Sequence, residues 1–308
     1  MISERKSLLG IRELDPDEIL EILDAAEPFK EVQERPIKKV PALRGITVVN
    51  LFFENSTRTR SSFELAEKRL SADVLNFSVS GSSVAKGESL RDTAQNIEAM
   101  NASMIVMRHP SPGACHFLDR HVKARVINAG DGQHEHPTQA LLDAVTLREK
   151  LGRIEGARIV ILGDVEHSRV ARSNIFLLTK LGAKVTVCGP PTMLPAEIAR
   201  LGVESTTDVR AALRQADAVN VLRIQFERQH EALIPSIREY ARYFGLTEDK
   251  LEGQPQLVVL HPGPMNRDTE IAHGVAEAHA GTILRQVSNG VAVRMAVLYL
   301  LSGGEGAN

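Results

Sequence analysis

The sequence contains no tryptophan and only two cysteines among its 308 residues. Cys115 and Cys188 lie in different halves of the chain and form no C-x-x-C pair. Neither a disulfide framework nor a cysteine-based zinc site is therefore expected. This cysteine usage favours a protein of a reducing compartment.

The chain also lacks a long hydrophobic run and a strong charge of either sign. No segment approaches the ~20 apolar residues of a membrane span, and the mixed charges of residues 1–6 lead into no signal-like core. The formal net charge of -2 gives no general attraction to nucleic acid or to an acidic membrane. We therefore predict a cytoplasmic protein with no nucleic-acid or membrane partner, in which any anion is bound by local groups.

The length and the pattern of the chain indicate the fold class. A chain of 308 residues fits two domains of about 150 residues each. Strand-like apolar runs alternate with segments of helical periodicity, which is typical of parallel sheets covered by helices. We predict an α/β protein of two domains, each a mostly parallel sheet flanked by helices.

Several elements can be placed individually. Asp15, Pro16 and Glu18 mark the start of a first helix, because they combine an N-cap, a first-turn proline and a box-like acid. A helix from Pro137 can bridge the two domains, whose boundary falls near 135–155. The remaining expected elements are strands near 46–53, 125–128, 158–162, 184–188, 217–222 and 256–260, βα units at 73–101 and 103–121, and a last apolar helix at roughly 289–301.

The turn after the strand at 46–53 carries an unusual set of polar residues. Ser56, Thr57 and Thr59 supply hydroxyls, and Arg58 and Arg60 supply forked cations, where a helix is expected to begin. Unpaired backbone N–H groups and the helix dipole favour an anion there, and arginine adds charge-assisted hydrogen bonds. A lone Ser-Thr-Arg would be better explained as a solvated helix cap. Five such residues in a row favour a phosphate site, in which Arg60 has the weaker claim.

Three further residues in the first half suit the same kind of ligand. Arg108 follows a strand-like run and is expected at the carboxyl edge of the sheet, where open α/β folds bind ligands. His136 and Gln139 are three residues apart on one helix face, able to bond a carbonyl oxygen and an amide-like NH2 together. The alternatives are an edge arginine paired with an acid and a histidine that caps a helix or is satisfied in the core.

The second half carries candidate carboxylate ligands. The turn at 163–169 has one glycine where a dinucleotide fingerprint needs three, so a Rossmann dehydrogenase is disfavoured. Arg169, at the start of the next helix, suits a carboxylate, whereas Arg223 and Gln225 would be ordinary loop residues if taken alone. The small polar residues at 80–88 would likewise be a surface linker by themselves.

Together these motifs resemble the aspartate and ornithine transcarbamoylase family. Residues 56–60 are similar to its carbamoyl-phosphate motif, and Met-Arg-His-Pro, Asn-Ala-Gly-Asp-Gly, His-Pro-Thr-Gln and His-Pro-Gly-Pro follow in family order, at 107–110, 128–132, 136–139 and 261–264. The resemblance spans nearly the whole chain. It implies a carbamoyl-phosphate-binding domain at 1–140, with a C-terminal helix at 289–308 packing back onto it, and an aspartate-binding domain at 141–288.

The resemblance also implies roles for individual residues. Thr59, Arg108 and His136 polarise the carbamoyl carbonyl, and the departing phosphate takes the proton of the amine, with His136 as general base the less favoured alternative. No metal, cofactor or covalent nucleophile is implied. Many of the family's aspartate enzymes have leucine where this chain has Gly263. The implied catalytic residues are Arg58, Thr59, Lys86, Arg108 and His136; the implied carbamoyl-phosphate ligands are Ser56, Thr57, Arg58, Thr59, Arg108, His136, Gln139, Gly263 and Pro264.

The choice of acceptor amine depends on the number of cations, because aspartate brings two carboxylates and ornithine only one. The implied aspartate ligands are Lys86, Arg169, Arg223 and Gln225. In the family's aspartate enzymes a loop like 80–88 reaches into the neighbouring subunit, so Ser82, or Ser83 beside it, and Lys86 imply a homotrimer with shared active sites.

The resemblance thus implies an enzyme that carbamoylates L-aspartate in an early step of pyrimidine synthesis. Two alternatives remain at this stage, an enzyme for ornithine or another amine and a non-catalytic subunit that binds anions. Further assembly with a regulatory chain or with dihydroorotase is left open.

Overall fold

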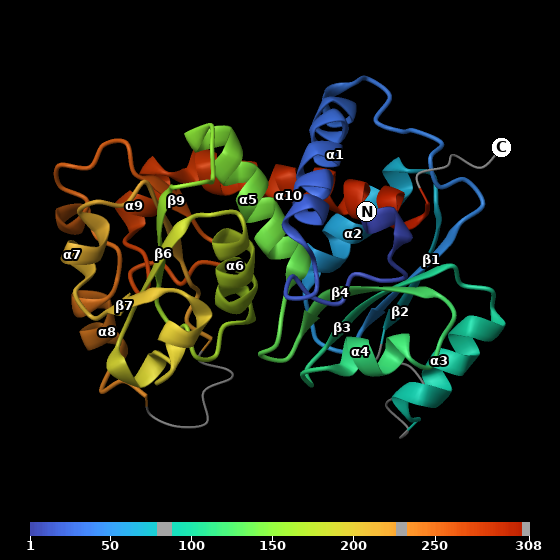
Figure 1. The fold of residues 1–308 in the computed structure, drawn as a ribbon, viewed down its shortest axis with the longest axis horizontal. Helices are drawn as coiled ribbons and strands as arrows, with labels where there is room; N and C mark the ends of the chain where they lie inside the picture. Colours follow the sequence, from blue (N-terminus) through green and yellow to red (C-terminus); the bar gives the residue numbers. More distant parts are fainter. Residues whose placement is uncertain (79–87, 226–232, 304–308) are drawn as a thin grey trace. The chain divides into compact units, whose positions relative to one another are not determined.

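The protein is described by a computed structural model that covers residues 1–78, 88–225 and 233–303. It forms two compact units, Met1–Leu142 with Ser288–Asn308 and Asp143–Val287. Each unit contains one sheet in which every strand pair is parallel, with helices around it (Figure 1). The predicted α/β class with two sheets is confirmed. The sequence analysis had placed the two domain boundaries after residues 140 and 288.

The sheet of unit 1 has the strand order β2-β1-β3-β4. Its strands are β1 Thr47–Phe52, β2 Asp73–Ser78, β3 Met104–His109 and β4 Arg125–Asp131. Figure 1 shows α3 and α4 on one side of this sheet and α1 and α2 on the other. Because β1 and β3 are covered on both faces, they read as nearly continuous apolar runs rather than as alternating patterns. The helices are α1 Pro16–Glu34, α2 Thr57–Arg69, α3 Leu90–Ala99 and α4 Ala114–Asp119.

The two faces of β1 pack against different helices. Val49 and Leu51 point into a core formed with α3 and α4, where Ile97 and Leu118 are fully buried. Alternate residues of a strand point to opposite faces, so Asn50 lies on the other face, where its amide nitrogen donates to Glu67 of α2 at 2.7 Å. The α2 helix is thereby held against the strand that leads into its own N-terminus.

The start of α1 follows the sequence prediction. Asp15 is the N-cap, Pro16 is the first helical residue, and the backbone N–H of Asp15 donates to Glu18 at 2.8 Å, which completes a capping box. Arg5 adds an ion pair to the same carboxylate at 2.5 Å. This hydrogen bond from Arg5 holds the pKa of Glu18 below its usual value. The Asp15, Pro16 and Glu18 signal is therefore confirmed.

Glu67 is a fully buried carboxyl group whose described contact is an amide rather than a cation. Burial raises its pKa to about 8, from 4.5. The folded state therefore keeps a proton up to about pH 8 that the unfolded chain releases near pH 4.5. Between these pH values folding takes up a proton, so the free energy of unfolding decreases as the pH rises.

Glu67→Gln is expected to remove this pH dependence, because glutamine can still accept from Asn50 and never ionises. The melting temperature of the variant relative to the wild type should rise between pH 5 and pH 8.5, reflecting on the order of a few kcal/mol. Glu64→Gln, on the same helix, is the control, because its pKa is lowered by Lys68 and its charge is constant in this range. Parallel melting curves for Glu67→Gln and the wild type across pH would contradict the assignment.

The sheet of unit 2 has the order β7-β6-β5-β8-β9. Its strands are β5 Arg158–Leu162, β6 Lys184–Cys188, β7 Glu204–Thr206, β8 Ala218–Val221 and β9 Val258–Leu260. The core contains Val160, Leu162, Val219, Val221 and Val259 with apolar residues of α7 and α9. The helices are α6 Arg169–Lys180, α7 Val209–Leu213, α8 Ile237–Tyr243 and α9 His273–Ala278. The described residues also include short 3-10 helices at Ile2–Glu4, Pro191–Met193, Ile198–Leu201 and Glu248–Lys250.

Two elements differ from the sequence prediction. The edge strand β7 was not expected, because Glu204 and Ser205 are exposed and provide no apolar pattern. The last helix, α10, spans Ala280–Leu301 and begins well before the predicted start at 289. Its first turns expose Leu284 and Val287 and bury the polar Gln286, so they lack the apolar stripe from which a helix is recognised.

Helices α5 (Pro137–Leu151) and α10 each continue from one unit into the other along the chain. The second part of α10 belongs to unit 1, where Arg294 donates to Ser62 at 3.0 Å and lies 5.0 Å from the ring centre of Phe63. Of the helices in the described part of the chain, none has the length and hydrophobicity of a membrane span.

Candidate active site

The predicted phosphate turn lies at the carboxyl edge of the first sheet. Ser56 is the N-cap residue of α2, and its carbonyl accepts from the N–H of Arg60 at 3.1 Å. Thr57, Arg58 and Arg60 are exposed, and Thr59 is partly exposed. The turn therefore presents the first N–H groups of a 13-residue helix, together with hydroxyl and guanidinium groups, to solvent.

Arg108 lies beside this turn because β1 and β3 are paired with Phe52 opposite Arg108. Its Nη1 atom is 3.5 Å from the hydroxyl of Thr59 and 3.3 Å from the carbonyl oxygen of Ala129. Its Nε atom is 3.5 Å from Glu54, and only 12% of the side chain is exposed. The structure thus brings Arg108 and Thr59 together, and it also contains the acidic partner that the alternative interpretation anticipated.

His136 and Gln139 occupy the start of α5. The carbonyl of His136 accepts from the N–H groups of Gln139 at 3.0 Å and Ala140 at 3.3 Å, so His136 directly precedes the helix. His136 is 4% exposed and Gln139 is 8% exposed. Both residues are therefore buried where α5 begins, His136 directly before the helix and Gln139 in its first turn.

The loop before His136 is fixed by Glu135, to which the sequence analysis gave no role, and by residues of the motif at 128–132. Glu135 is fully buried and accepts from the N–H groups of Ile11 at 2.8 Å and Arg12 at 3.1 Å. The side-chain amide of Asn128 donates to Asp131 at 2.7 Å, and its side-chain oxygen accepts from the backbone N–H of Gly130. No local pattern reveals the contacts of Glu135, because its partners Ile11 and Arg12 lie more than a hundred positions away in the sequence.

The predicted residues of unit 2 follow three neighbouring strands. Arg169 begins α6 after β5, and Ser168 caps that helix by accepting from Ala171 at 3.1 Å. Arg223 and Gln225 follow β8 and are partly exposed. Since β5, β8 and β9 are adjacent and parallel, residues that follow them share one edge of this sheet.

The segment after β9 has a distinctive backbone. Gly263 and Pro264 are joined by a cis peptide bond, and Gly263 has φ +62°, a conformation that glycine adopts without steric cost. The N–H of Gly263 donates to Nδ1 of His261 at 2.8 Å, which leaves the other ring nitrogen of His261 to face Glu270 at 3.2 Å. His261 and Glu270 are both buried. The pair therefore holds the turn that carries Gly263.

A buried polar network continues from His261. Its backbone N–H donates to Gln286 at 2.9 Å, and Gln286 in turn donates to Asp143 at 2.8 Å. Asp143 also accepts from Asn174 at 2.9 Å and Asn220 at 3.1 Å. The Asp143 carboxylate thus links α5, α6, β8 and the start of α10 and, through Gln286, the chain after β9. Of this network the sequence analysis had singled out only His261, as part of the motif at 261–264.

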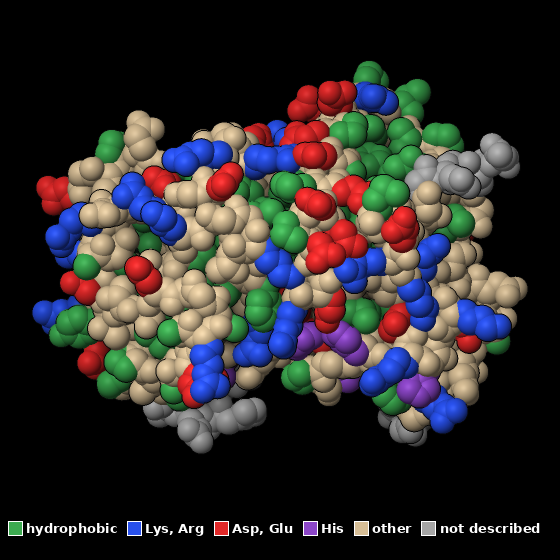
Figure 2. All heavy atoms as spheres, viewed as in Figure 1, with side chains coloured by type: hydrophobic (Ala, Val, Ile, Leu, Met, Phe, Trp, Pro, Cys, Tyr) green, Lys and Arg blue, Asp and Glu red, His purple; other side chains and the backbone are tan. Residues whose placement is uncertain are grey.

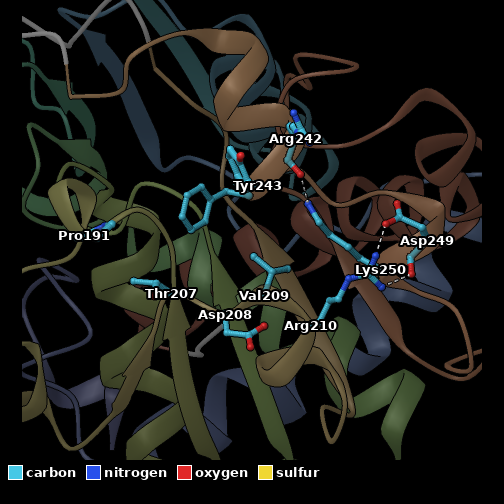
Figure 3. Close-up of a pocket in the computed structure, with 10 residues that line it drawn as sticks. Pro191, Thr207, Asp208, Val209, Arg210, Arg242, Tyr243, Asp249 and Lys250 are labelled. Atoms are coloured by element: carbon cyan, nitrogen blue, oxygen red, sulfur yellow. Dashed lines mark hydrogen bonds and ion pairs between the residues drawn. The ribbon is translucent and has the colours of Figure 1, made fainter.

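Unit 2 also contains a pocket of about 570 Å³ away from the predicted residues. Arg210 binds the side chain and carbonyl of Asp249, and Lys250 donates to the carbonyls of Arg242 at 3.1 Å and Gly245 at 2.6 Å (Figure 3). Burial lowers the pKa of Lys250. These cations have protein partners, so the pocket does not compete with the predicted site as an anion-binding region.

The charge distribution supports binding by local groups. Figure 2 shows basic and acidic side chains interspersed over the visible face of the molecule. The predicted carbamoyl-phosphate residues Ser56–Arg60, Arg108, His136 and Gln139 belong to unit 1. The other predicted residues in the described part of the chain, Arg169, Arg223, Gln225, Gly263 and Pro264, belong to unit 2. Ser82 and Lys86 lie outside the described residues.

Comparison with known protein families identifies the class. Residues 6–149 match the carbamoyl-P binding domain of aspartate/ornithine carbamoyltransferase, and residues 155–301 match the Asp/Orn binding domain. The chain belongs to the aspartate/ornithine carbamoyltransferase family.

Curated relatives narrow this class to one branch. An aspartate carbamoyltransferase catalytic subunit from Gemmatimonas aurantiaca is 59% identical over 301 residues, which cover 97% of this chain and 94% of that relative. The catalytic subunit from Cytophaga hutchinsonii is 58% identical, with 97% of each chain covered.

Solved structures show the same relationship. Aspartate transcarbamoylase from Trypanosoma cruzi in complex with carbamoyl phosphate has a TM-score of 0.86 at 28% identity, covering 96% of each chain. Its complex with N-(phosphonacetyl)-L-aspartic acid has a TM-score of 0.87 at 29% identity, covering 96% of this chain and 95% of that one. The catalytic subunit of the M. jannaschii enzyme has a TM-score of 0.84 at 34% identity, covering 96% of this chain and 98% of that one.

Proposed function

We propose that the protein is an aspartate carbamoyltransferase, which transfers the carbamoyl group of carbamoyl phosphate to the amino group of L-aspartate. The products are N-carbamoyl-L-aspartate and phosphate, in an early step of pyrimidine synthesis de novo. The observation that carries the proposal is the 59% identity to a catalytic subunit of that name over 97% of the chain. The anion-binding groups at the sheet edges of both units support it.

The phosphate of carbamoyl phosphate is proposed to bind at the N-terminus of α2. Ser56 and Thr57 offer hydroxyls there, and Arg58 is an exposed cation one helical residue further on. Helix N–H groups and a guanidinium together suit a dianion. Arg60 is also exposed, and we assign it no direct contact.

Thr59, Arg108 and His136 are proposed to polarise the carbamoyl carbonyl. The amine attacks the carbonyl carbon, the oxygen gains negative charge, and the bond from carbon to the phosphate oxygen then breaks. Prepositioned donors stabilise that oxygen without reorganising during the reaction. The distance of 3.5 Å between Arg108 and Thr59 supports their action on one atom.

Gln139 and the chain at Gly263 and Pro264 are proposed to hold the carbamoyl nitrogen. A side-chain oxygen and a backbone carbonyl are suitable acceptors for an NH2 group. The departing phosphate is proposed to accept the proton that the amine loses, which keeps the transfer direct.

Arg169, Arg223, Gln225 and Lys86 are proposed to bind aspartate. Each of the two arginines can bind one carboxylate through two parallel hydrogen bonds. The position of Arg169 at the first residue of α6 adds the favourable end of the helix dipole. This set supports aspartate over ornithine, which has a single carboxylate and a second ammonium group.

The central test is phosphate release by the purified protein with carbamoyl phosphate and either aspartate or ornithine. Aspartate is expected to support turnover, and N-(phosphonacetyl)-L-aspartic acid is expected to inhibit it. Turnover with ornithine but not with aspartate would contradict the proposal and would identify ornithine as the acceptor. Binding of carbamoyl phosphate without turnover on either amino acid would indicate a non-catalytic subunit.

We further propose a homotrimer in which Ser82 and Lys86 of one subunit complete the site of its neighbour. Lys86→Ala and Arg58→Ala are each expected to be inactive alone. Mixing them under conditions of subunit exchange should restore part of the activity, because some sites then receive an intact Lys86 and an intact Arg58. Absence of recovery in mixed trimers that have formed would contradict sharing.

The cytoplasm is the proposed compartment. Cys115 and Cys188 are both free and buried, and a reducing environment keeps such thiols unmodified.

A further inference from the structure

Two histidines and two carboxylates that have no role in the proposed reaction gather in unit 1. Within the part of the chain that the structure describes, a ring nitrogen of His116, a ring nitrogen of His134 and a carboxylate oxygen of Asp131 all lie within 4.8 Å of one another. The two imidazole rings are 5.3 Å apart at an angle of 70°. Glu13 joins the group through a contact of 2.9 Å to Nε2 of His116.

We propose that His116, His134 and Asp131, with Glu13 as a fourth ligand, form a binding site for a divalent transition metal of the zinc type. Imidazole nitrogen and carboxylate oxygen are common ligands of Zn²⁺. Two neutral imidazoles and two carboxylates also balance the charge of a divalent cation.

The contacts within the group have the spacing of metal ligands. A tetrahedral Zn²⁺ with bonds of about 2.0–2.1 Å separates its ligand atoms by about 3.3 Å. Nδ1 of His134 lies 3.1 Å from Asp131, and Nε2 of His116 lies 2.9 Å from Glu13. The ligand atoms of His116, His134 and Asp131 lie within 4.8 Å of one another, so binding requires them to approach by at most about 1.5 Å.

Three of the four ligands are partly exposed and can move toward the buried one, which makes this closure feasible. The side chains of His116, His134 and Glu13 are 31%, 27% and 41% exposed and can rotate, whereas Asp131 is fully buried. Gly113 and Asn128 donate to the Asp131 carboxylate at 2.8 Å and 2.7 Å. These hydrogen bonds hold the Asp131 carboxylate in a fixed orientation, as donors behind the ligands do in metal sites.

The site would connect three parts of unit 1 that are distant in the sequence. Glu13 precedes α1, His116 lies in α4, and His134 lies in the loop between β4 and α5. His134 is two residues before His136, so a bound metal would stiffen the loop that leads into the proposed active site. The metal itself has no part in carbamoyl transfer, and its binding is measured without substrates.

The test is a titration of the metal-free full-length protein with Zn²⁺ at pH 8, followed by calorimetry and by melting temperature. This pH is chosen because the hydrogen bond to Asp131 raises the pKa of His134, and a protonated imidazole does not bind metal. One Zn²⁺ per chain is expected, with a melting temperature that rises with the free Zn²⁺ concentration. Co²⁺ in place of Zn²⁺ is expected to show the visible absorption of a four-coordinate centre.

Matched variants distinguish the site from scattered binding by surface histidines. His116→Ala and Glu13→Gln should each weaken Zn²⁺ binding, the histidine change by at least about tenfold, as expected for loss of one imidazole ligand. His121→Ala is the control, since His121 follows the same helix but contacts the carbonyl of Phe117 instead.

Equal Zn²⁺ binding by the wild type, His116→Ala and His134→Gln would overturn the site, as would the absence of saturable binding to the wild type. Should His116→Ala fail to fold, His134→Gln decides the question, because His134 is partly exposed and replaceable. Unchanged Zn²⁺ affinity in His134→Gln would refute the site, and unchanged affinity in Glu13→Gln would overturn the assignment of Glu13 as fourth ligand.

Discussion

Arg108→Ala is expected to lower kcat about 10³-fold, because removal of one donor from an oxyanion site costs about 10²–10³ in rate and Glu54 also loses its arginine. The guanidinium lies 3.5 Å from Thr59 and is largely buried beside the phosphate turn. Steady-state phosphate release with saturating aspartate measures the effect. Arg108→Lys should recover only part of the rate, because lysine keeps the charge without the planar fork of donors.

Arg120→Ala is the control for this experiment. Arg120 is an exposed arginine at the end of α4 in the same unit, so its loss should leave kcat unchanged. A value of kcat for Arg108→Ala close to that of the wild type would remove Arg108 from the reaction and leave it as a partner of Glu54.

Arg169→Ala is expected to raise the KM for aspartate about 100-fold while the affinity for carbamoyl phosphate is retained. A bidentate pair with a carboxylate contributes about 3 kcal/mol, because each charged hydrogen bond is worth about 1.5–3 kcal/mol, and 1.4 kcal/mol corresponds to a factor of ten. Equilibrium binding of carbamoyl phosphate and steady-state kinetics separate the two quantities. Since Arg169 is only 2% exposed, Arg169→Lys provides a variant that keeps a buried cation.

Arg158→Ala tests whether the effect depends on position. Arg158 lies at the amino end of β5, the strand whose other end leads to Arg169, and pairs with Asp217 at 3.5 Å. Its replacement should leave the KM for aspartate unchanged. An equal rise in KM for both variants would indicate a general disturbance of unit 2, and no rise for Arg169→Ala would remove it from the aspartate site.

The sequence predicted the elements whose signals are local. The capping box of Asp15 and Glu18 begins α1 as expected, and the buried strands β1, β3, β5 and β8 coincide with apolar runs. Strand β7 was missed because an exposed edge strand of three residues needs no apolar side chains. The early start of α10 was missed because its first turns bury Gln286 rather than an apolar stripe.

The candidate site was predictable only for groups that belong to a recognisable motif. Arg108 and Thr59 could be placed near one another because strand ends and helix starts meet at one sheet edge. Glu135 and Asp143 could not be found in this way, since their partners are set by tertiary structure. His261 belongs to the quoted motif at 261–264, but its contact to Glu270 was not predictable. The assignments of substrate-binding roles to individual residues stay predictions until the variants are measured.

The membership of residues 288–301 in unit 1 bears on how the chain folds during its synthesis. Unit 2 is a continuous segment and emerges from the ribosome whole. The first segment of unit 1 emerges earlier but stays without Arg294, which donates to Ser62 and lies over the ring of Phe63 in the middle of α2. The helix that carries the phosphate turn therefore acquires this support only after the whole of unit 2 has been synthesised, so a chain truncated before Arg294 would be left with an incompletely supported phosphate site.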